Sequence, residues 1–302
     1  LNTIDRVLGG AAAHTAEITL PVPVARTFQL HATRIDADAV SEPTAYAEIA
    51  AVVMFHDMTT AVRAEQMRVD FVNNASHELR SPLTAILGFI ETLKGPAQDD
   101  AAARDRFLGI MAREAERMRR LIEDLLSLSK VEADEHVRPC DHVDVGAVVR
   151  GVADLLDGRA TEREMVLSLN IAEGLPTVIG NENQLAQVFR NIIENAIAYG
   201  REHTPVTVAA EAVERLPDTG RPGVVVRVAD QGKGIPPDAI PRLTERFFRV
   251  DEARSPGRSG NPNSTGLGLA IVKHIVNRHR GRLRIESELG KGSTFSVFLP
   301  SE

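Results

Sequence analysis

The sequence predicts a multidomain α+β protein, in which a helical hairpin is followed by an α/β sandwich. Three observations predict this fold. Apolar residues recur at intervals of three and four across 71–90, which is the pattern of an amphipathic helix. A second long helical pattern covers 101–131, and strand and helix patterns then alternate to the C-terminus. The length of 302 residues suits two or three domains, because a domain typically takes about 150 residues.

The composition describes an ordinary globular protein, with 43% hydrophobic and 25% charged residues. The net charge of −7 argues against nucleic-acid binding, which needs a basic surface. The single cysteine, Cys140, excludes an intrachain disulfide and a thiolate metal cluster. No apolar run reaches the ~18 residues of a membrane-spanning helix. We therefore expect this stretch to be cytoplasmic, with any inner-membrane anchor in a part that precedes Leu1.

Residues 1–58 contain a short helical piece and three strand-like runs, at 17–20, 28–35 and 45–56. Three antiparallel strands bury little apolar surface by themselves. The segment resembles the C-terminal half of a PAS sensor domain, whose last strand ends in Asp-x-Thr before a signalling helix. Here that step is Asp57-Met58-Thr59. A linker hairpin is the alternative interpretation, and no ligand is assigned to the segment.

Residues 59–138 are predicted to form the helical hairpin. The first helix covers 60–94 and ends at Gly95-Pro96, and the second covers 101–131. One hairpin cannot cover both apolar stripes. Pairing with a second copy into a four-helix bundle would cover them, so we expect a homodimer.

The second helix of this hairpin is also rich in arginine and glutamate. We interpret it as a solvated, salt-bridged face, and docking of an acidic partner is the alternative. The basic residues are Arg104, Arg106, Arg113, Arg117, Arg119 and Arg120.

The first helix carries His77 within the string SHELRSPL. Ser81 lies one turn further along the same face, Arg80 borders that face, and Glu78 reaches only the side of the ring. Pro82 cannot donate to the carbonyl of Glu78, so a local bend is predicted. A lone histidine on a helix is more often structural than catalytic.

The neighbours of this histidine change that interpretation. The string resembles the H-box of HisKA-type sensor histidine kinases, usually SHELRTPL, with Ser81 where the family usually has threonine. The longer string over 71–95 most resembles the phosphate-regulon sensor kinases.

Residues 139–302 should form a mixed sheet with helices on one face. A linker is expected at 132–141. The helix that starts at Asn181 opens with the capping-box pattern, in which Gln184 stands three residues later. The predicted helices are 145–164, 181–199 and 266–279, and the predicted strands are 165–170, 177–179, 206–213, 224–230, 282–287 and 293–299.

Three pieces of this domain suit a nucleotide. Asn191 and Asn195 are one turn apart on a helix, and carboxamide oxygens suit Mg²⁺. Asp230 follows an apolar strand in DQGKG, where a carboxylate can accept the adenine amine; a simple turn is the alternative. The string TGLGL from Thr265 opens a helix, whose free N–H groups favour phosphates.

Together with the string RFFR at 246–249, these pieces resemble in chain order the N, G1, F and G2 boxes of the Bergerat-type ATPase fold, which histidine kinases share with gyrase, Hsp90 and MutL. The resemblance implies ATP and Mg²⁺, with Asn195 as the metal ligand and Asn191 beside it. It also implies that Arg249 contacts the terminal phosphate and that residues 250–264 form a lid. The implied nucleotide-binding residues are Asn191, Asn195, Tyr199, Asp230, Gly232, Gly234, Phe248, Arg249, Thr265, Gly266, Leu267 and Gly268.

The resemblance implies that ATP phosphorylates His77, and that the phosphoryl group passes to an aspartate in the receiver domain of a response regulator. Glu78 would act as general base and Arg80 would assist. In the family the residue at position 81 orients a water that dephosphorylates the regulator. Ser81 keeps a hydroxyl but lacks the threonine methyl that restricts its rotation, so we expect kinase activity to survive this substitution and phosphatase activity to be affected by it.

Two further positions depart from the family pattern. Ala198 stands where the family often has a lysine or arginine on a phosphate, and Arg201 or Lys273 could substitute. His279-Arg280-Gly281 replaces the usual His-Gly-Gly; His274, His279 and Cys140 are interpreted as structural. The competing functions are a non-catalytic dimeric scaffold that binds nucleotide, which only Ala198 favours, and a gyrase- or MutL-like ATPase.

Overall fold

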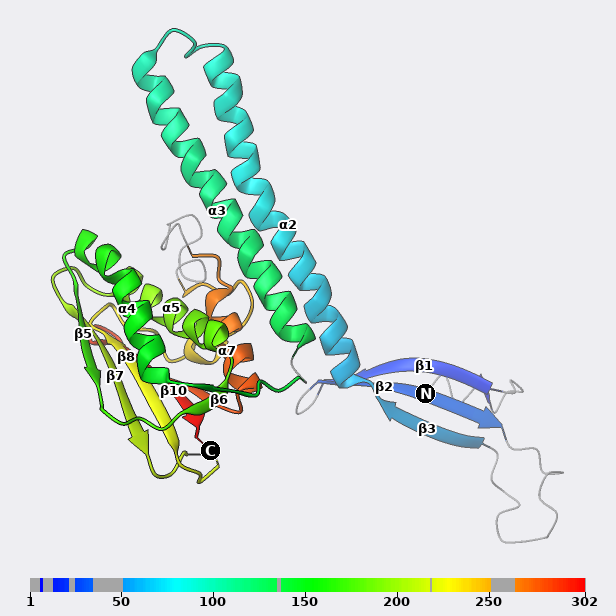
Figure 1. Cartoon of the computed structure of the whole chain (residues 1–302). Helices are drawn as coiled ribbons and strands as arrows, with labels where there is room; N and C mark the ends of the chain where they lie inside the picture. Colours follow the sequence, from blue (N-terminus) through cyan, green and yellow to red (C-terminus); the bar gives the residue numbers. More distant parts are fainter. Residues whose placement is uncertain are drawn as a thin grey trace, which may run out of the picture. The chain divides into compact units, whose positions relative to one another are not determined.

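The computed structural model describes residues 6–7, 13–21, 25–34, 51–134, 137–217, 219–250 and 264–301 (Figure 1). The chain divides into two compact units, Leu1–Glu78 and Leu79–Glu302, whose boundary falls inside one long helix. None of the helices in these described ranges has both the length and the apolar character needed to cross a bilayer.

The first unit contains an antiparallel sheet in the order β1-β2-β3. The strands are β1 (Ala13–Leu20), β2 (Arg26–Arg34) and β3 (Ala51–Asp57). Leu30 and Ala32 are buried against Val7. The three predicted strands are confirmed, although β1 begins earlier than expected, and residues 45–50 of the third lie outside the described residues. The likeness to half a PAS domain stays a prediction.

The helical hairpin consists of α2 (Thr59–Lys94) and α3 (Ala101–Ala133). Asp100 caps α3, since its side chain accepts the N–H of Ala103. Helix α2 continues through Pro82, whose side chain is buried. Both predicted helices are confirmed. Helix α3 extends past residue 131 into the expected linker, because Val131 is buried and Glu132 forms an ion pair with Arg246.

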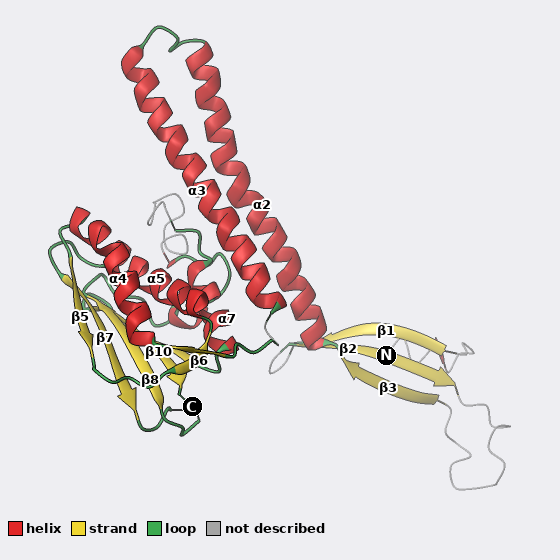
Figure 2. Ribbon diagram, viewed as in Figure 1, coloured by secondary structure: helices red, strands yellow, loops and turns green. Residues whose placement is uncertain are grey.

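The C-terminal sheet has the order β5-β7-β8-β10-β9, with β5 and β7 parallel and the other pairs antiparallel. Helices α4, α5 and α7 cover one face of it, as Figure 2 shows. The predicted α/β sandwich is therefore confirmed. The strands are β5 (Val166–Ile171), β7 (Pro205–Val213), β8 (Gly223–Asp230), β9 (Arg282–Glu288) and β10 (Gly292–Pro300), and the helices are α4 (Val145–Glu162), α5 (Glu182–Tyr199) and α7 (Gly268–Arg278).

Two short elements were not predicted. Strand β4 (Asp141–Val143) pairs with β6 (Val178–Gly180), so the expected linker ends in a strand. A 3₁₀ turn, η2 (Ile240–Arg242), has a proline near its N-terminus. Each of these two elements has three residues, which are too few to show a periodicity.

The start of α5 differs from the predicted capping box. Asn181 caps the helix by accepting the N–H of Gln184 at 3.0 Å. The N–H of Asn181, which Gln184 would accept in a full box, instead donates to Nε2 of His279 at 2.9 Å. Nδ1 of His279 in turn donates to the carbonyl of Ile275 at 2.8 Å. This buried position lowers the pKa of His279 and confirms that it is a structural residue.

Candidate nucleotide site and phosphoacceptor helix

The histidine of the SHELRSPL string lies on the solvent-exposed surface of α2. His77, Arg80 and Ser81 are exposed, and Glu78 is half-buried. The helix is continuous through all four residues, so Ser81 follows His77 by one turn on the same face. The imidazole is therefore accessible to a reaction partner.

Helix α5 brings the two predicted asparagines toward the start of α7. Ile192, Ile193 and Ala196 are buried, which orients the opposite face of α5 away from the core. Asn191 lies on this less buried face, and its Nδ2 donates to the carbonyl of Gly268 at 3.2 Å. This contact joins the N box to the G2 box. Asn195 is half-buried one turn later on α5.

Asp230 ends strand β8 as a buried carboxylate in a tightly folded loop. It is 8% exposed, and its Oδ1 accepts the N–H of Gly232 at 2.7 Å. Burial raises its pKa, against the lowering effect of the backbone donors. A Cβ on Gly232 would collide with the carbonyl oxygen of Tyr199, and one on Gly234 with that of Glu288. Both glycines are therefore required by close backbone approach.

The F and G2 boxes meet at Phe247 and Gly266. The N–H of Phe247 donates to the carbonyl of Gly266 at 2.9 Å, and both residues have positive φ, 64° and 72°. Because of this conformation the helix starts at Gly268 and not at Gly266 as predicted. Arg242 lies over the ring of Phe248, 4.3 Å from its centroid. Residues 251–263, most of the expected lid, lie outside the described residues.

The contacts that α3 makes with the F and G2 boxes were not predicted from the sequence. The hydroxyl of Thr265 donates to Oδ2 of Asp124 at 2.6 Å, and Arg246 pairs with Glu132. Asp124 is half-buried, and this burial raises its pKa. The two residues of each pair are more than 100 positions apart in the chain, so no local sequence pattern predicts the contact.

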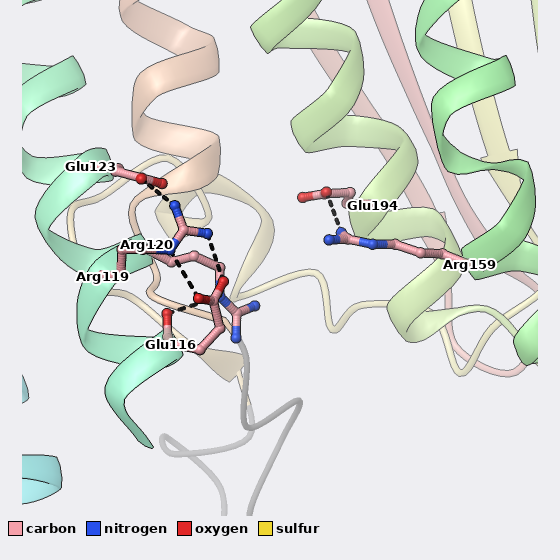
Figure 3. A network of polar contacts seen from close by, with 6 residues as sticks. All are labelled: Glu116, Arg119, Arg120, Glu123, Arg159 and Glu194. Carbon is pink, nitrogen blue, oxygen red and sulfur yellow. Dashed lines mark hydrogen bonds and ion pairs between the residues drawn. The ribbon is translucent and has the colours of Figure 1, made fainter. Parts of the chain in front are cut away.

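Ion pairs occur on α3 and between α4 and α5 (Figure 3). On α3, Arg119 pairs with Glu116 and Glu123, and Arg120 pairs with Glu116. These pairs support the predicted salt-bridged face for Arg119 and Arg120. Such exposed pairs contribute little to stability, because solvent screens their charges. A separate pair, Arg159–Glu194, joins α4 to α5 (Figure 3).

Two family models match the chain. The His Kinase A (phospho-acceptor) domain, HisKA, matches residues 67–134. The histidine kinase-, DNA gyrase B- and HSP90-like ATPase, HATPase_c, matches residues 180–302. The first match contains the exposed His77, and the second contains the asparagine helix and both glycine-rich pieces.

Curated relatives and solved structures agree with these matches. The phosphate regulon sensor protein PhoR of Pseudomonas aeruginosa is 38% identical over 260 residues, which is 86% of this chain and 56% of PhoR. The sensor-like histidine kinase SenX3 of Mycolicibacterium smegmatis is 36% identical over 250 residues, 83% of this chain and 62% of SenX3. The chain thus spans between half and two thirds of the length of these two relatives. The crystal structure of full-length ShkA in complex with AMPPNP matches with a TM-score of 0.54 at 27% identity, covering 78% of this chain and 45% of that one. The chain belongs to the sensor histidine kinases.

Proposed function

We propose that this chain is the kinase core of a two-component sensor. It transfers the γ-phosphoryl group of ATP to His77 and then to an aspartate in the receiver domain of a response regulator. The observation that carries this proposal is the presence, in one chain, of an exposed histidine in SHELRSPL and a separate site in which Asn191 meets the first turn of α7. The HisKA match contains His77 and the HATPase_c match contains the nucleotide site, which supports this assignment.

The domain boundaries follow from this assignment. We place a sensor-like segment at 1–58, the dimerisation and phosphotransfer hairpin at 59–138, and the ATP-binding domain at 139–302. Large apolar residues of the hairpin stay exposed in a single chain, which supports burial against a second copy in a homodimer. On α2 and α3 these include Leu83, Leu87, Leu108, Ile122 and Leu126.

The loop after β8 fits the adenine end of ATP. The carboxylate of Asp230 is buried and can accept a hydrogen bond from the exocyclic amine. Gly232 and Gly234 stand where a side chain would collide with neighbouring backbone, so the loop stays thin enough for the base to approach. The other end of the site, from Thr265 to Gly268, presents the N-terminus of α7 to the phosphates.

The asparagines of α5 fit a magnesium site. The amide nitrogen of Asn191 is held by the carbonyl of Gly268, which leaves its carboxamide oxygen for another partner. Asn195 offers a second oxygen one turn away, and oxygen ligands are those that Mg²⁺ prefers. When bound, Mg²⁺ neutralises part of the negative charge of the phosphates.

The chemical step assigns a role to each residue near His77. One imidazole nitrogen, unprotonated and with a free lone pair, forms the new bond to the γ-phosphorus while the bond to the ADP oxygen breaks. Glu78 holds the proton on the other ring nitrogen and accepts it as the ring becomes positive. Arg249 stabilises charge on the moving group, and Arg80 assists. Ser81 then orients a water in the regulator phosphatase reaction.

Labelling with γ-³²P ATP separates this function from its two competitors. A histidine kinase yields protein-bound label that is acid-labile and base-stable, and His77→Ala abolishes it. A scaffold, which the missing cation at Ala198 would favour, binds nucleotide but gives no label. A gyrase- or MutL-like ATPase releases phosphate without labelling itself. Label that survives in the His77→Ala variant contradicts the proposal.

A further inference from the structure

The C-terminus of the asparagine helix is held by a residue that no motif includes. Arg163 directly follows α4, and its guanidinium donates to the carbonyls of Ile197 and Ala198, the latter at 2.6 Å. It also lies 3.6 Å from a carboxylate oxygen of Glu202. The last carbonyls of a helix have no partner within it and form the negative end of the helix dipole. A planar guanidinium can satisfy two of them at once.

Helix α5 has no basic residue of its own in its last turn. Ala198, which stands in that turn, supplies no charge. Arg163 therefore brings a positive charge from α4 to a helix end that lacks one. Both of its hydrogen bonds to α5 go to backbone oxygens, so they hold the backbone of this helix end in place.

The turn that Arg163 holds also connects to the adenine loop. It contains Asn195 and ends in Tyr199, whose carbonyl oxygen lies so close to Gly232 that a Cβ there would collide with it. The N–H of Gly232 in turn donates to Asp230. A displacement of the end of α5 would therefore move Asn195 and the loop of Asp230 together.

We propose that Arg163 is a positioning residue for the nucleotide. It fixes the last turn of α5, so that Asn195 and the Asp230 loop meet ATP in their binding geometry, and it makes no contact with ATP itself. This inference rests on the proposed function, in which ATP occupies this site. Its consequence is a loss of nucleotide affinity, and not only of stability, when the guanidinium is removed.

The test is a titration of the full chain, in the presence of Mg²⁺, with the fluorescent nucleotide TNP-ATP. Arg163→Met keeps the apolar stem and removes the donors, and it should raise Kd about fivefold to tenfold. Arg163→Lys keeps the positive charge and N–H donors but has a shorter side chain without the planar guanidinium, so its Kd should fall between those of the wild type and Arg163→Met. If Arg163→Met does not fold, the lysine variant still makes the comparison with the wild type.

Arg159→Met is the matched control. Arg159 lies one turn earlier on α4 and also joins α4 to α5, but through the side chain of Glu194. Loss of this exposed pair should leave Kd within about twofold. An equal effect from both arginine variants would overturn the positioning role, because any loosening of the α4–α5 contact would then be enough.

A double-mutant cycle with Asn195→Ala distinguishes positioning from general destabilisation. If Arg163 acts through Asn195, its loss costs less affinity when Asn195 is already absent; independent effects would multiply. Strictly multiplicative losses, or an unchanged Kd in Arg163→Met, overturn the inference while the wild type still binds. Failure of the wild type to bind TNP-ATP would instead overturn the proposed function itself.

Discussion

The hydroxyl of Thr265 donates a 2.6 Å hydrogen bond to Oδ2 of Asp124. Thr265 immediately precedes the glycines at which we place the phosphates, and Asp124 belongs to the phosphotransfer hairpin. The carboxylate of Asp124 accepts the hydrogen bond of the Thr265 hydroxyl, and its negative charge repels the phosphates of a bound nucleotide.

Removing the charge of Asp124 should therefore strengthen nucleotide binding. Asp124→Asn keeps the size of the side chain and an acceptor for Thr265 while it removes the repulsion. We expect Kd for TNP-ATP to fall about threefold to tenfold, the size of a modest coulombic effect. Glu123→Gln is the control, because Glu123 pairs with Arg119 on the exposed surface of α3. Weaker binding in the Asp124 variant, or an equal change in both, contradicts this interpretation.

The end of α7 carries an arginine in a conformation that favours glycine. The N–H of Gly281 donates to Val276 and that of Arg280 to Asn277, the two hydrogen bonds of a Schellman motif. Arg280 is the left-handed residue of this motif, with φ 53°. Arg280→Gly should raise the free energy of unfolding by about 1 kcal/mol, because glycine adopts this conformation without a steric cost.

The neighbouring glycine provides the opposite control. A Cβ at Gly281 would collide with the carbonyl oxygen of Phe298, so Gly281→Ala should destabilise the same domain. Thermal unfolding of both variants checks the pair. A lower melting temperature for Arg280→Gly would contradict the interpretation that the left-handed conformation of Arg280 is strained.

His279 should make the stability of the ATP-binding domain depend on pH. Its pKa is lowered by burial below the ordinary 6.5, and its unprotonated Nε2 accepts the N–H of Asn181. The stabilising contribution is therefore complete above pH ~6.5 and is lost as the pH falls through the lowered pKa. Urea unfolding at pH values from about 8 to 5 measures this loss. The loss should be smaller in His279→Gln, which does not titrate in this range; an equal loss in both proteins would contradict it.

The long periodic segments of this chain were predictable from the sequence because each carries its own pattern. The apolar stripes of α2, α3 and α5 and the apolar runs of β8 and β10 fix their element types locally. The glycine-rich strings DQGKG and TGLGL were visible in the sequence, and Gly232, Gly234 and Gly266 stand where backbone comes close or φ is positive.

The features that were missed depend on residues far apart in the chain. The capping-box pattern at Asn181 was locally correct, but His279, 98 residues away, takes the donor that Gln184 was expected to bind. The hydrogen bonds of Thr265 to Asp124 and of Arg163 to the end of α5 form only when the chain is folded. No periodicity encodes such pairs, because they result from tertiary packing.

The central claim is that phosphate from ATP reaches the imidazole of residue 77. Its most direct test is mass spectrometry of the tryptic peptide 69–80, after incubation of the full chain with Mg²⁺ and ATP and digestion at neutral pH. We expect one added phosphoryl group on His77, and less of it in the Asn195→Ala variant, which lacks the proposed metal ligand. Phosphate on a different residue, or an unmodified peptide from a chain that has consumed ATP, would contradict it.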